Sequence, residues 1–227
     1  VAEYTVALML SLNRKIPRAS WRTKDGNFSL HGLMGFDMHG KTAGIIGTGK
    51  IAKILIHILK GFGMNILAYD LYPDYNFARE EQIVYTSLDE LYHSSDIISL
   101  HCPLTEATKY LINDYSISKM KDGVMIINTG RGQLIHTNAL IEGLKNKKIG
   151  SAGLDVYEEE SEYFYEDQSD RIIDDDVLAR LLSFNNVIVT SHQAFFTREA
   201  MENIAMTTLQ NIKDFINHKP LLNEVKR

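Results

Sequence analysis

The fold is decided by residues 42–52, which read TAGIIGTGKIA. The apolar run 42–46 ends in the glycine-rich turn Gly47-Thr48-Gly49, and apolar residues then recur at helical spacing over residues 50–60. A second apolar run, 65–69, ends at Asp70. This order predicts a strand, a tight turn, a helix and a second, parallel strand.

The same alternation continues along the chain. The sequence predicts further strands at 97–100, 124–127, 149–154 and 187–190, and helices at 87–93, 114–121 and 137–146. A helix from about the first residue to Lys15, a loop over 23–40 and a long helix over 197–218 are also expected. Short buried strands that alternate with helices are typical of an α/β fold with a doubly wound parallel sheet.

Composition narrows the function classes. The 227 residues are 44% hydrophobic and 23% charged, with a formal net charge of -5, so no basic footprint for nucleic acid is expected. No apolar run reaches the length of a membrane span, and the single cysteine excludes an internal disulfide, which favours a cytoplasmic protein. The histidines are dispersed and predict no metal site.

The glycine turn predicts a dinucleotide site. Gly47 permits the tight turn, Gly49 lets the main chain approach a pyrophosphate, and the small Ala52 lets the helix pack closely on the strand. The helix amino terminus would offer unpaired N–H groups to phosphates. Asp70 ends the next strand, where a carboxylate binds ribose hydroxyls and repels a 2′-phosphate, so NAD is favoured over NADP.

Three predicted strands end in reactive side chains. Arg131 follows the strand 124–127, the acidic run 158–160 follows 149–154, and His192 follows 187–190. Ligands of doubly wound sheets bind outside these carboxyl ends. The residues alone do not separate Glu158, Glu159 and Glu160. The acidic segment 158–176, with aromatic residues at 163–165, is expected to be a solvated loop pinned by a few aromatic side chains.

Six motifs in order make the chain resemble the D-specific 2-hydroxyacid dehydrogenases, most of all their fermentative, lactate-type members. The motifs are VAEYT (1–5), GIIGTG (44–49), HCPLT (101–105), NTGRG (128–132), GLDVYE (153–158) and HQAF (192–195). The resemblance covers essentially the whole chain. It implies a Rossmann-like NAD-binding domain at 1–192 and a segment, 193–227, that returns to a substrate domain largely missing from this chain.

The resemblance also assigns roles. The reacting trio would be Arg131, Glu160 and His192, with Glu160 chosen because it lies five positions beyond Asp155. Phe195 would close a small substrate pocket with Arg131 and His192. The implied cofactor-binding residues are Gly47, Thr48, Gly49, Lys50, Ile51, Asp70, His101, Cys102, Pro103, Thr129, Gly130, Arg131, Asp155 and His192.

The expected activity is NADH-dependent reduction of pyruvate to D-lactate, in a homodimer or higher homo-oligomer. Hydride transfer needs no covalent intermediate, so Cys102 is not expected to be a nucleophile. Two alternatives stay open. The first is a dehydrogenase for another D-2-hydroxy acid, of the hydroxyisocaproate or phosphoglycerate type. The second is an NAD-sensing, corepressor-like binding protein, which would retain similar residues without turnover.

Overall fold

The structure is a computed structural model that describes residues 1–224 except 160–163, 166, 168, 170 and 171. The chain divides into two compact units, 1–194 and 195–227. Each unit is described by itself.

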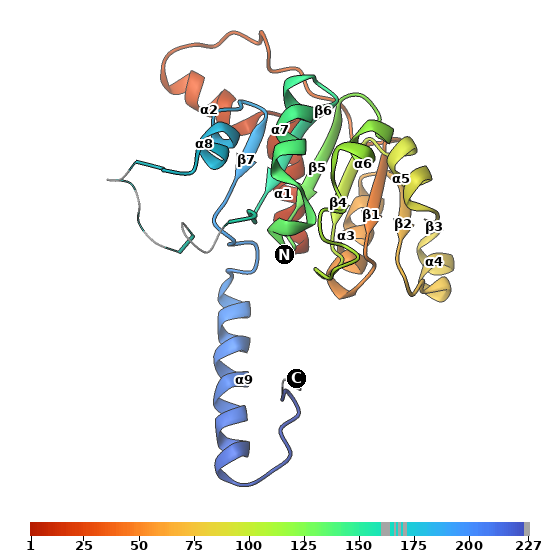
Figure 1. Cartoon of the computed structure of the whole chain (residues 1–227), viewed down its shortest axis with the longest axis vertical. Coiled ribbons are helices and arrows are strands. Elements are labelled where there is room, and N and C mark those ends of the chain that lie inside the picture. Colours follow the sequence, from red (N-terminus) through yellow and green to blue (C-terminus); the bar gives the residue numbers. More distant parts are fainter. Residues whose placement is uncertain (160–163, 166, 168, 170–171, 225–227) are drawn as a thin grey trace. The chain divides into compact units, whose positions relative to one another are not determined.

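The first unit is built on a parallel sheet, which confirms the predicted fold class (Figure 1). In the described part of the chain its strands are β1 (Thr42–Ile46), β2 (Asn65–Tyr69), β3 (Val84–Tyr85), β4 (Ile97–Leu100), β5 (Val124–Asn128), β6 (Ile149–Leu154) and β7 (Val187–Val189). The strand order is β3-β2-β1-β4-β5-β6-β7, and every pairing is parallel. The order reverses direction between β1 and β4, which is where such sheets bind ligands.

Helices cover both faces of the sheet. They are α1 (Ala2–Asn13), α2 (Ile16–Lys24), α3 (Lys50–Gly61), α4 (Tyr75–Glu81), α5 (Leu88–Ser94), α6 (Asp114–Lys119), α7 (Thr137–Lys145) and α8 (Asp176–Leu182), with a 3-10 turn, η1 (Gly132–Leu134). Buried residues of α1 and α3 join one apolar cluster, and those of α5, α6, α7 and α8 join the other.

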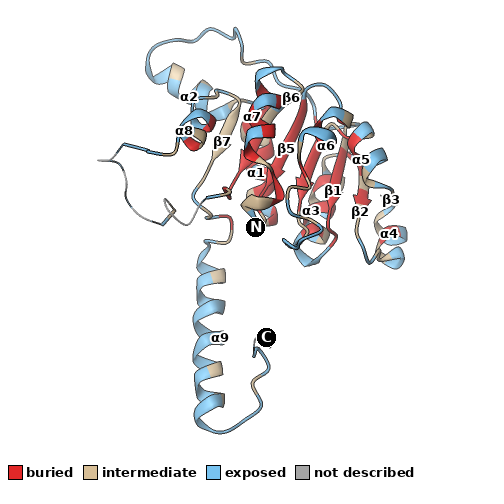
Figure 2. Ribbon diagram, in the orientation of Figure 1, coloured by how far each residue is buried: buried red, intermediate tan, exposed pale blue. Residues whose placement is uncertain are grey.

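Strand β5 shows why both faces need cover. Its residues alternate between the two clusters, with Val124 and Ile126 on one side and Met125 and Ile127 on the other. All four side chains are at most 3% exposed. Figure 2 shows this buried sheet between helices whose outer surfaces are exposed. A strand buried on both faces is a continuous apolar run, which explains the pattern at 124–127.

Five elements were not among those predicted: α2, α4, β3, α8 and the 3-10 turn η1. Pro17 suggested the end of a helix, yet it lies in the first turn of α2, where proline leaves no hydrogen bond unmade. β3 has only two residues, and α4 and α8 have seven each, so they offer little periodicity to detect. The predicted loop is therefore shorter, since α2 continues to Lys24.

The acidic segment 158–176 is described only in part, because residues 160–163, 166, 168, 170 and 171 are not described. Phe164 packs against the cluster beneath α5 to α8, as expected of an aromatic pin. Tyr163 lies outside the described residues.

The second unit contains α9 (Arg198–Ile216), close to the predicted helix at 197–218. Thr197 caps this helix, because its hydroxyl accepts a hydrogen bond from the Ala200 N–H at 3.2 Å. Among the residues that the structure describes, no helix is both long and apolar enough to cross a bilayer.

Candidate active site

The glycine turn has the geometry that a pyrophosphate requires. Gly47 has a φ of +90°, and a Cβ atom there would lie 2.5 Å from the backbone nitrogen of Cys102. At Gly49 a Cβ atom would meet nothing within 4 Å, so the main chain is open to a ligand. Gly49 begins α3 without a side-chain cap, which leaves the first N–H groups of that helix for an anion. The turn therefore fits NAD.

The predicted cofactor-binding residues beside the turn lie at the start of α3 or within the turn itself. Lys50 and Ile51 form the first turn of α3, and both are exposed. Thr48 is only 5% exposed because its polar atoms face inward, toward Asp70.

Asp70 closes the other side of the turn. Its Oδ2 accepts hydrogen bonds from the Thr48 N–H at 2.6 Å and the Thr48 hydroxyl at 2.9 Å, and its Oδ1 accepts one from the Tyr72 N–H at 2.8 Å. Partial burial opposes the charged form, but these hydrogen bonds outweigh it and lower the pKa of Asp70 below its ordinary 3.8. The carboxylate is charged at neutral pH and can accept from ribose hydroxyls.

The loop after β4 packs against the glycine turn, because backbone atoms of His101 and Cys102 lie next to Gly47. Burial lowers the pKa of His101 to about 4, and its Nε2 lies 2.8 Å from the buried Ser99 hydroxyl. Burial also raises the pKa of Cys102 to about 11. The thiol is therefore protonated at neutral pH and is not a ready nucleophile. Pro103, next in the chain, is exposed.

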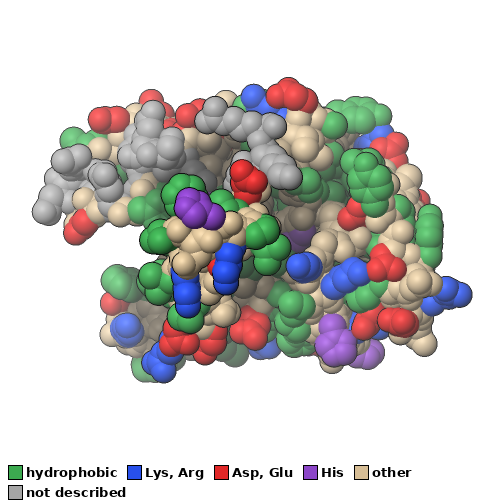
Figure 3. Space-filling view, turned by 90° about the horizontal axis from the view of Figure 1, so that it is seen from below, with side chains coloured by type: hydrophobic (Ala, Val, Ile, Leu, Met, Phe, Trp, Pro, Cys, Tyr) green, Lys and Arg blue, Asp and Glu red, His purple; other side chains and the backbone are tan. Residues whose placement is uncertain are grey.

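The carboxyl ends of β5, β6 and β7 are tied together by backbone hydrogen bonds. The Asp155 N–H donates to the Asn128 carbonyl at 2.9 Å, which joins β6 to β5. The His192 N–H donates to the Asp155 carbonyl at 2.7 Å, which joins the loop after β7 to the end of β6. Figure 3 views the molecule from below, on the side of these strand ends. The loops that carry Arg131 and His192 thus lie at one edge of the sheet.

Asn128 shapes the loop that carries Arg131. Its side chain, 1% exposed, accepts from the Gly130 N–H at 3.0 Å and donates to the Arg131 carbonyl at 2.8 Å. Thr129 is anchored to α1, because its hydroxyl lies 3.0 Å from that of Thr5. The Arg131 side chain is exposed, and its Nη1 donates to the Gly130 carbonyl at 2.8 Å. The loop that carries the guanidinium is therefore held by hydrogen bonds of Asn128 and Thr129.

Asp155 shapes the loop that carries His192. Its fully buried carboxylate accepts from the Thr190 hydroxyl at 2.6 Å, the Gln193 N–H at 2.9 Å and the Ala194 N–H at 2.7 Å. His192 itself has a φ of +56°, a conformation that non-glycine residues seldom adopt. The surrounding hydrogen bonds hold this backbone, which places the imidazole beyond the end of β7.

The three glutamates of the acidic run differ in their surroundings. Glu158 accepts from the Tyr110 hydroxyl and, through Oε2, from the Thr137 hydroxyl at 2.9 Å, so it is bound to the amino end of α7. Glu159 is exposed. Glu160, the predicted catalytic partner, lies outside the described residues, and its role stays a prediction.

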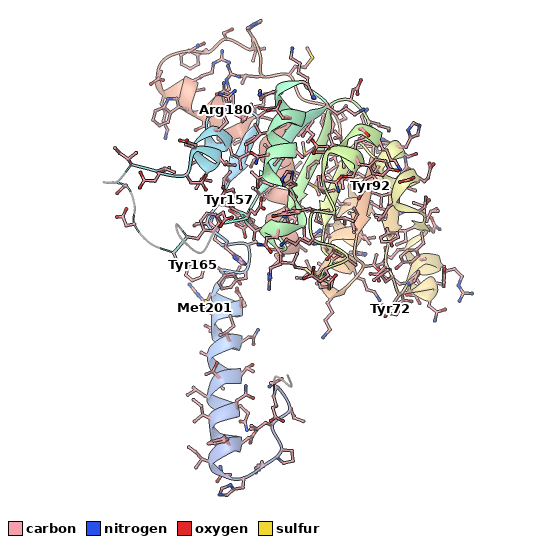
Figure 4. All side chains as sticks on the ribbon, in the orientation of Figure 1. Tyr72, Tyr92, Tyr157, Tyr165, Arg180 and Met201 are labelled. Carbon is pink, nitrogen blue, oxygen red and sulfur yellow. The ribbon has the colours of Figure 1, made fainter. Side chains whose placement is uncertain are left out.

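One aromatic residue, Phe195, was predicted to line the substrate pocket, and a second, Tyr165, lies beside His192. Tyr165, labelled in Figure 4, lies with its ring centroid 6.1 Å from that of His192, at an interplanar angle of 32°. Phe195 belongs to the second unit, where its ring lies edge-on to Phe196 with centroids 6.2 Å apart. Tyr165 was expected only as a pin of the acidic loop, and its position in the sequence gives no sign of a histidine neighbour.

The hydrogen bonds that Asn128 and Tyr85 make beside the predicted site residues were not predicted from the sequence. Asn128 carried a detectable signal, because a polar residue that ends a wholly apolar strand needs buried partners. Tyr85 carried none, since β3 is too short to show a pattern and its partner, Thr48, is distant in sequence.

Known proteins with similar sequences indicate the same family of dehydrogenases. Residues 6–194 match the model of the D-isomer specific 2-hydroxyacid dehydrogenase, NAD binding domain. A D-lactate dehydrogenase of Escherichia coli (strain K12) is 52% identical over 225 residues, which are 99% of this chain and 68% of that protein.

Solved structures of related enzymes are similar to this chain along most of its length. The pyruvate reductase of Chlamydomonas reinhardtii superposes with a TM-score of 0.94 at 46% identity, over 98% of this chain and 67% of that one. A D-lactate dehydrogenase from Aquifex aeolicus, complexed with NAD and lactic acid, gives a TM-score of 0.87 at 37% identity, over 96% of this chain and 66% of that one. The chain thus spans about two thirds of the length of these relatives. With its family match, its parallel sheet and its open glycine turn, the chain belongs to the D-isomer specific 2-hydroxyacid dehydrogenases, a family of NAD-dependent oxidoreductases.

Proposed function

We propose that the protein to which this chain belongs reduces pyruvate to D-lactate with NADH. The observation that carries the proposal is the hydrogen-bonded edge of the sheet, where the Arg131 loop, Asp155 and the His192 loop are joined. The glycine turn after β1 opens at the same end of the parallel sheet, because the carboxyl ends of parallel strands share one edge.

Bound NADH supplies a hydride, and the protein must place and polarise the 2-oxo acid beside it. Arg131 suits the substrate carboxylate, because a guanidinium grips a carboxylate through two parallel hydrogen bonds. Its hydrogen-bonded loop fixes the direction from which the carbonyl is presented. The same positive charge stabilises the negative charge that grows on the carbonyl oxygen.

His192 is proposed to donate the proton that the carbonyl oxygen gains. Imidazole is the side chain whose charge changes near neutrality, so it can donate in one direction and accept in the other. A carboxylate partner on the second ring nitrogen would orient the ring and stabilise its charged form. We assign this partner to Glu160. The engagement of Glu158 with Tyr110 and Thr137 supports a partner further along the run.

The remaining assignments are also proposals. Residues 1–192 would form the dinucleotide-binding domain, and 193–227 would return to the substrate domain. Phe195 would limit the substrate to a small side chain. We also propose a cytoplasmic location, which the single free cysteine fits, and a homodimer or higher homo-oligomer.

The experiment is NADH oxidation with a panel of 2-oxo acids by the protein to which this chain belongs, followed by chiral analysis of the product. We expect pyruvate to give the highest kcat/KM and D-lactate as the product. If a bulkier 2-oxo acid gives the highest kcat/KM, that acid would take the place of pyruvate as the proposed substrate. NADH binding without turnover of any 2-oxo acid would reject the enzyme in favour of a sensor.

A further inference from the structure

A chain of hydrogen bonds leads from β3 to the carboxylate of Asp70. The Tyr85 hydroxyl donates to the Thr48 Oγ1 at 2.8 Å, and the Thr48 hydroxyl donates to the Asp70 Oδ2 at 2.9 Å. The Asp74 N–H donates to the Tyr85 oxygen at 3.2 Å. Tyr85 stands on the edge strand of the sheet, beyond β2, and none of the sequence motifs includes it.

The donor-to-acceptor direction of this series of hydrogen bonds is fixed by the groups at its two ends. An N–H group only donates, and an ionised carboxylate only accepts. The Tyr85 oxygen accepts from Asp74, so its own hydrogen is directed to Thr48, and the Thr48 hydrogen is directed to Asp70. Each bond in such a chain polarises the next, which strengthens the bond that reaches the carboxylate.

Asp74, at the outer end of the series of hydrogen bonds, is itself held in place. Asp74 caps α4 by accepting from the Phe77 N–H at 3.1 Å, and it forms a 2.5 Å ion pair with Lys53 of α3. The Tyr75 ring lies edge-on to the Tyr85 ring, with centroids 5.8 Å apart. The Tyr85 hydroxyl is held by its two hydrogen bonds, and the side chains of Tyr85 and Asp70 are both half-buried. Tyr72, which marks the bend after Asp70, is labelled in Figure 4.

We propose that Tyr85 is a positioning residue that, through Thr48, fixes the Asp70 carboxylate and so sets the preference for NAD over NADP. The inference rests on the proposed NAD site and goes beyond it, because it assigns a role to a residue outside the glycine turn and outside the reacting groups. An anchored carboxylate can accept from the ribose hydroxyls without losing rotational freedom on binding. The same anchored charge cannot move away from a 2′-phosphate, which would carry nearly two negative charges.

The test measures equilibrium binding of NADH and NADPH by calorimetry, without turnover, for Tyr85→Phe and for the wild-type chain. Loss of the hydroxyl is expected to raise the Kd for NADH about threefold to tenfold, the size of one hydrogen bond between neutral groups such as that from Tyr85 to Thr48. The Kd for NADPH should rise less or fall, so the ratio of the two constants should drop by about threefold or more on the same reasoning.

Tyr75→Phe is the matched control. It removes a hydroxyl from the neighbouring ring, which is 67% exposed and has no hydrogen bond through that hydroxyl among the described residues. This variant should bind both cofactors as the wild type does. Thermal unfolding of each variant establishes that the fold is kept.

A double-mutant cycle with Thr48→Val tests the route. If Tyr85 acts through the Thr48 hydroxyl, Tyr85→Phe should add little to the loss already caused by Thr48→Val. Fully additive losses would overturn the route. Equal cofactor preferences for Tyr85→Phe, Tyr75→Phe and the wild type would overturn the role of Tyr85 while leaving the NAD site intact. Failure of the wild type to bind NADH would overturn the proposed function as well.

Discussion

The imidazole of His101 is uncharged at neutral pH because burial lowers its pKa from 6.5 to about 4. Between these two values the unfolded chain binds a proton that the folded chain does not, so folding stability rises with pH and is lost as pH falls from about 6.5 toward 4. We expect this histidine to remove about 2–3 kcal/mol of unfolding free energy across that window.

The measurement is the free energy of unfolding by urea from pH 7 to pH 4. His101→Gln, which keeps a donor near Ser99, should flatten the acid side of the profile. His31→Gln removes an exposed histidine and should leave the profile unchanged. A wild-type slope in His101→Gln would show that other groups cause the acid sensitivity.

Asp155 is expected to govern both stability and turnover. Asp155→Asn places an amide against N–H donors at Gln193 and Ala194, and one unsatisfied buried donor costs about 1–3 kcal/mol. The His192 loop would shift, and turnover should fall about 10- to 100-fold. Asp122→Asn breaks only an exposed pair with Lys148 and should change neither quantity measurably. An Asp155→Asn protein with wild-type stability and kcat would refute this role.

At this scale the sequence predicts residue types better than partners. Asp70 was predicted from its place after a strand, and its contact with the glycine turn follows from parallel pairing of β1 and β2. The three glutamates at 158–160 could not be separated, because the partner that engages Glu158, Tyr110, comes from a loop 48 positions away. Such contacts depend on tertiary packing rather than on local pattern.

Among the elements, the central strands were the easiest to predict from the sequence. β1, β2, β4 and β6 begin and end at the predicted residues, because each is a short run of mostly apolar or small residues. The edge strand β3 and the short helices α4 and α8 could not be predicted in this way. They are held by capping residues such as Asp74 and Asp175 and by contacts with neighbouring elements.

The loop after β5 should depend on Asn128. Asn128→Ala removes the partners of the Gly130 N–H and the Arg131 carbonyl, at a cost of about 1–3 kcal/mol of unfolding free energy. Because Arg131 is proposed to bind the substrate, the KM for pyruvate should rise more than the Kd for NADH. Asn65→Ala removes one exposed hydrogen bond, to Gly40, and is the control. Equal rises in both constants for Asn128→Ala would argue against a specific effect on the Arg131 loop.

For the molecule as a whole, the proposed function depends on one edge of the parallel sheet. The glycine turn follows β1, and the loop that begins at His101 follows β4. The loops that carry Arg131, Asp155 and His192 follow β5, β6 and β7, respectively. Parallel strands bring all these loops to the same edge although they are far apart in sequence. The proposed function therefore requires that groups at this edge act on a substrate beside bound NADH.

The most direct measurement is the kcat for pyruvate reduction by His192→Gln, taken with the Kd for NADH on the same preparation of the protein to which this chain belongs. Loss of a positioned proton donor should lower kcat by about 10²- to 10⁴-fold. Because the proposed site of NADH binding is built mainly by the glycine turn and Asp70, the Kd should stay within about twofold, less than one lost hydrogen bond would cause. Undiminished turnover in His192→Gln would contradict the account.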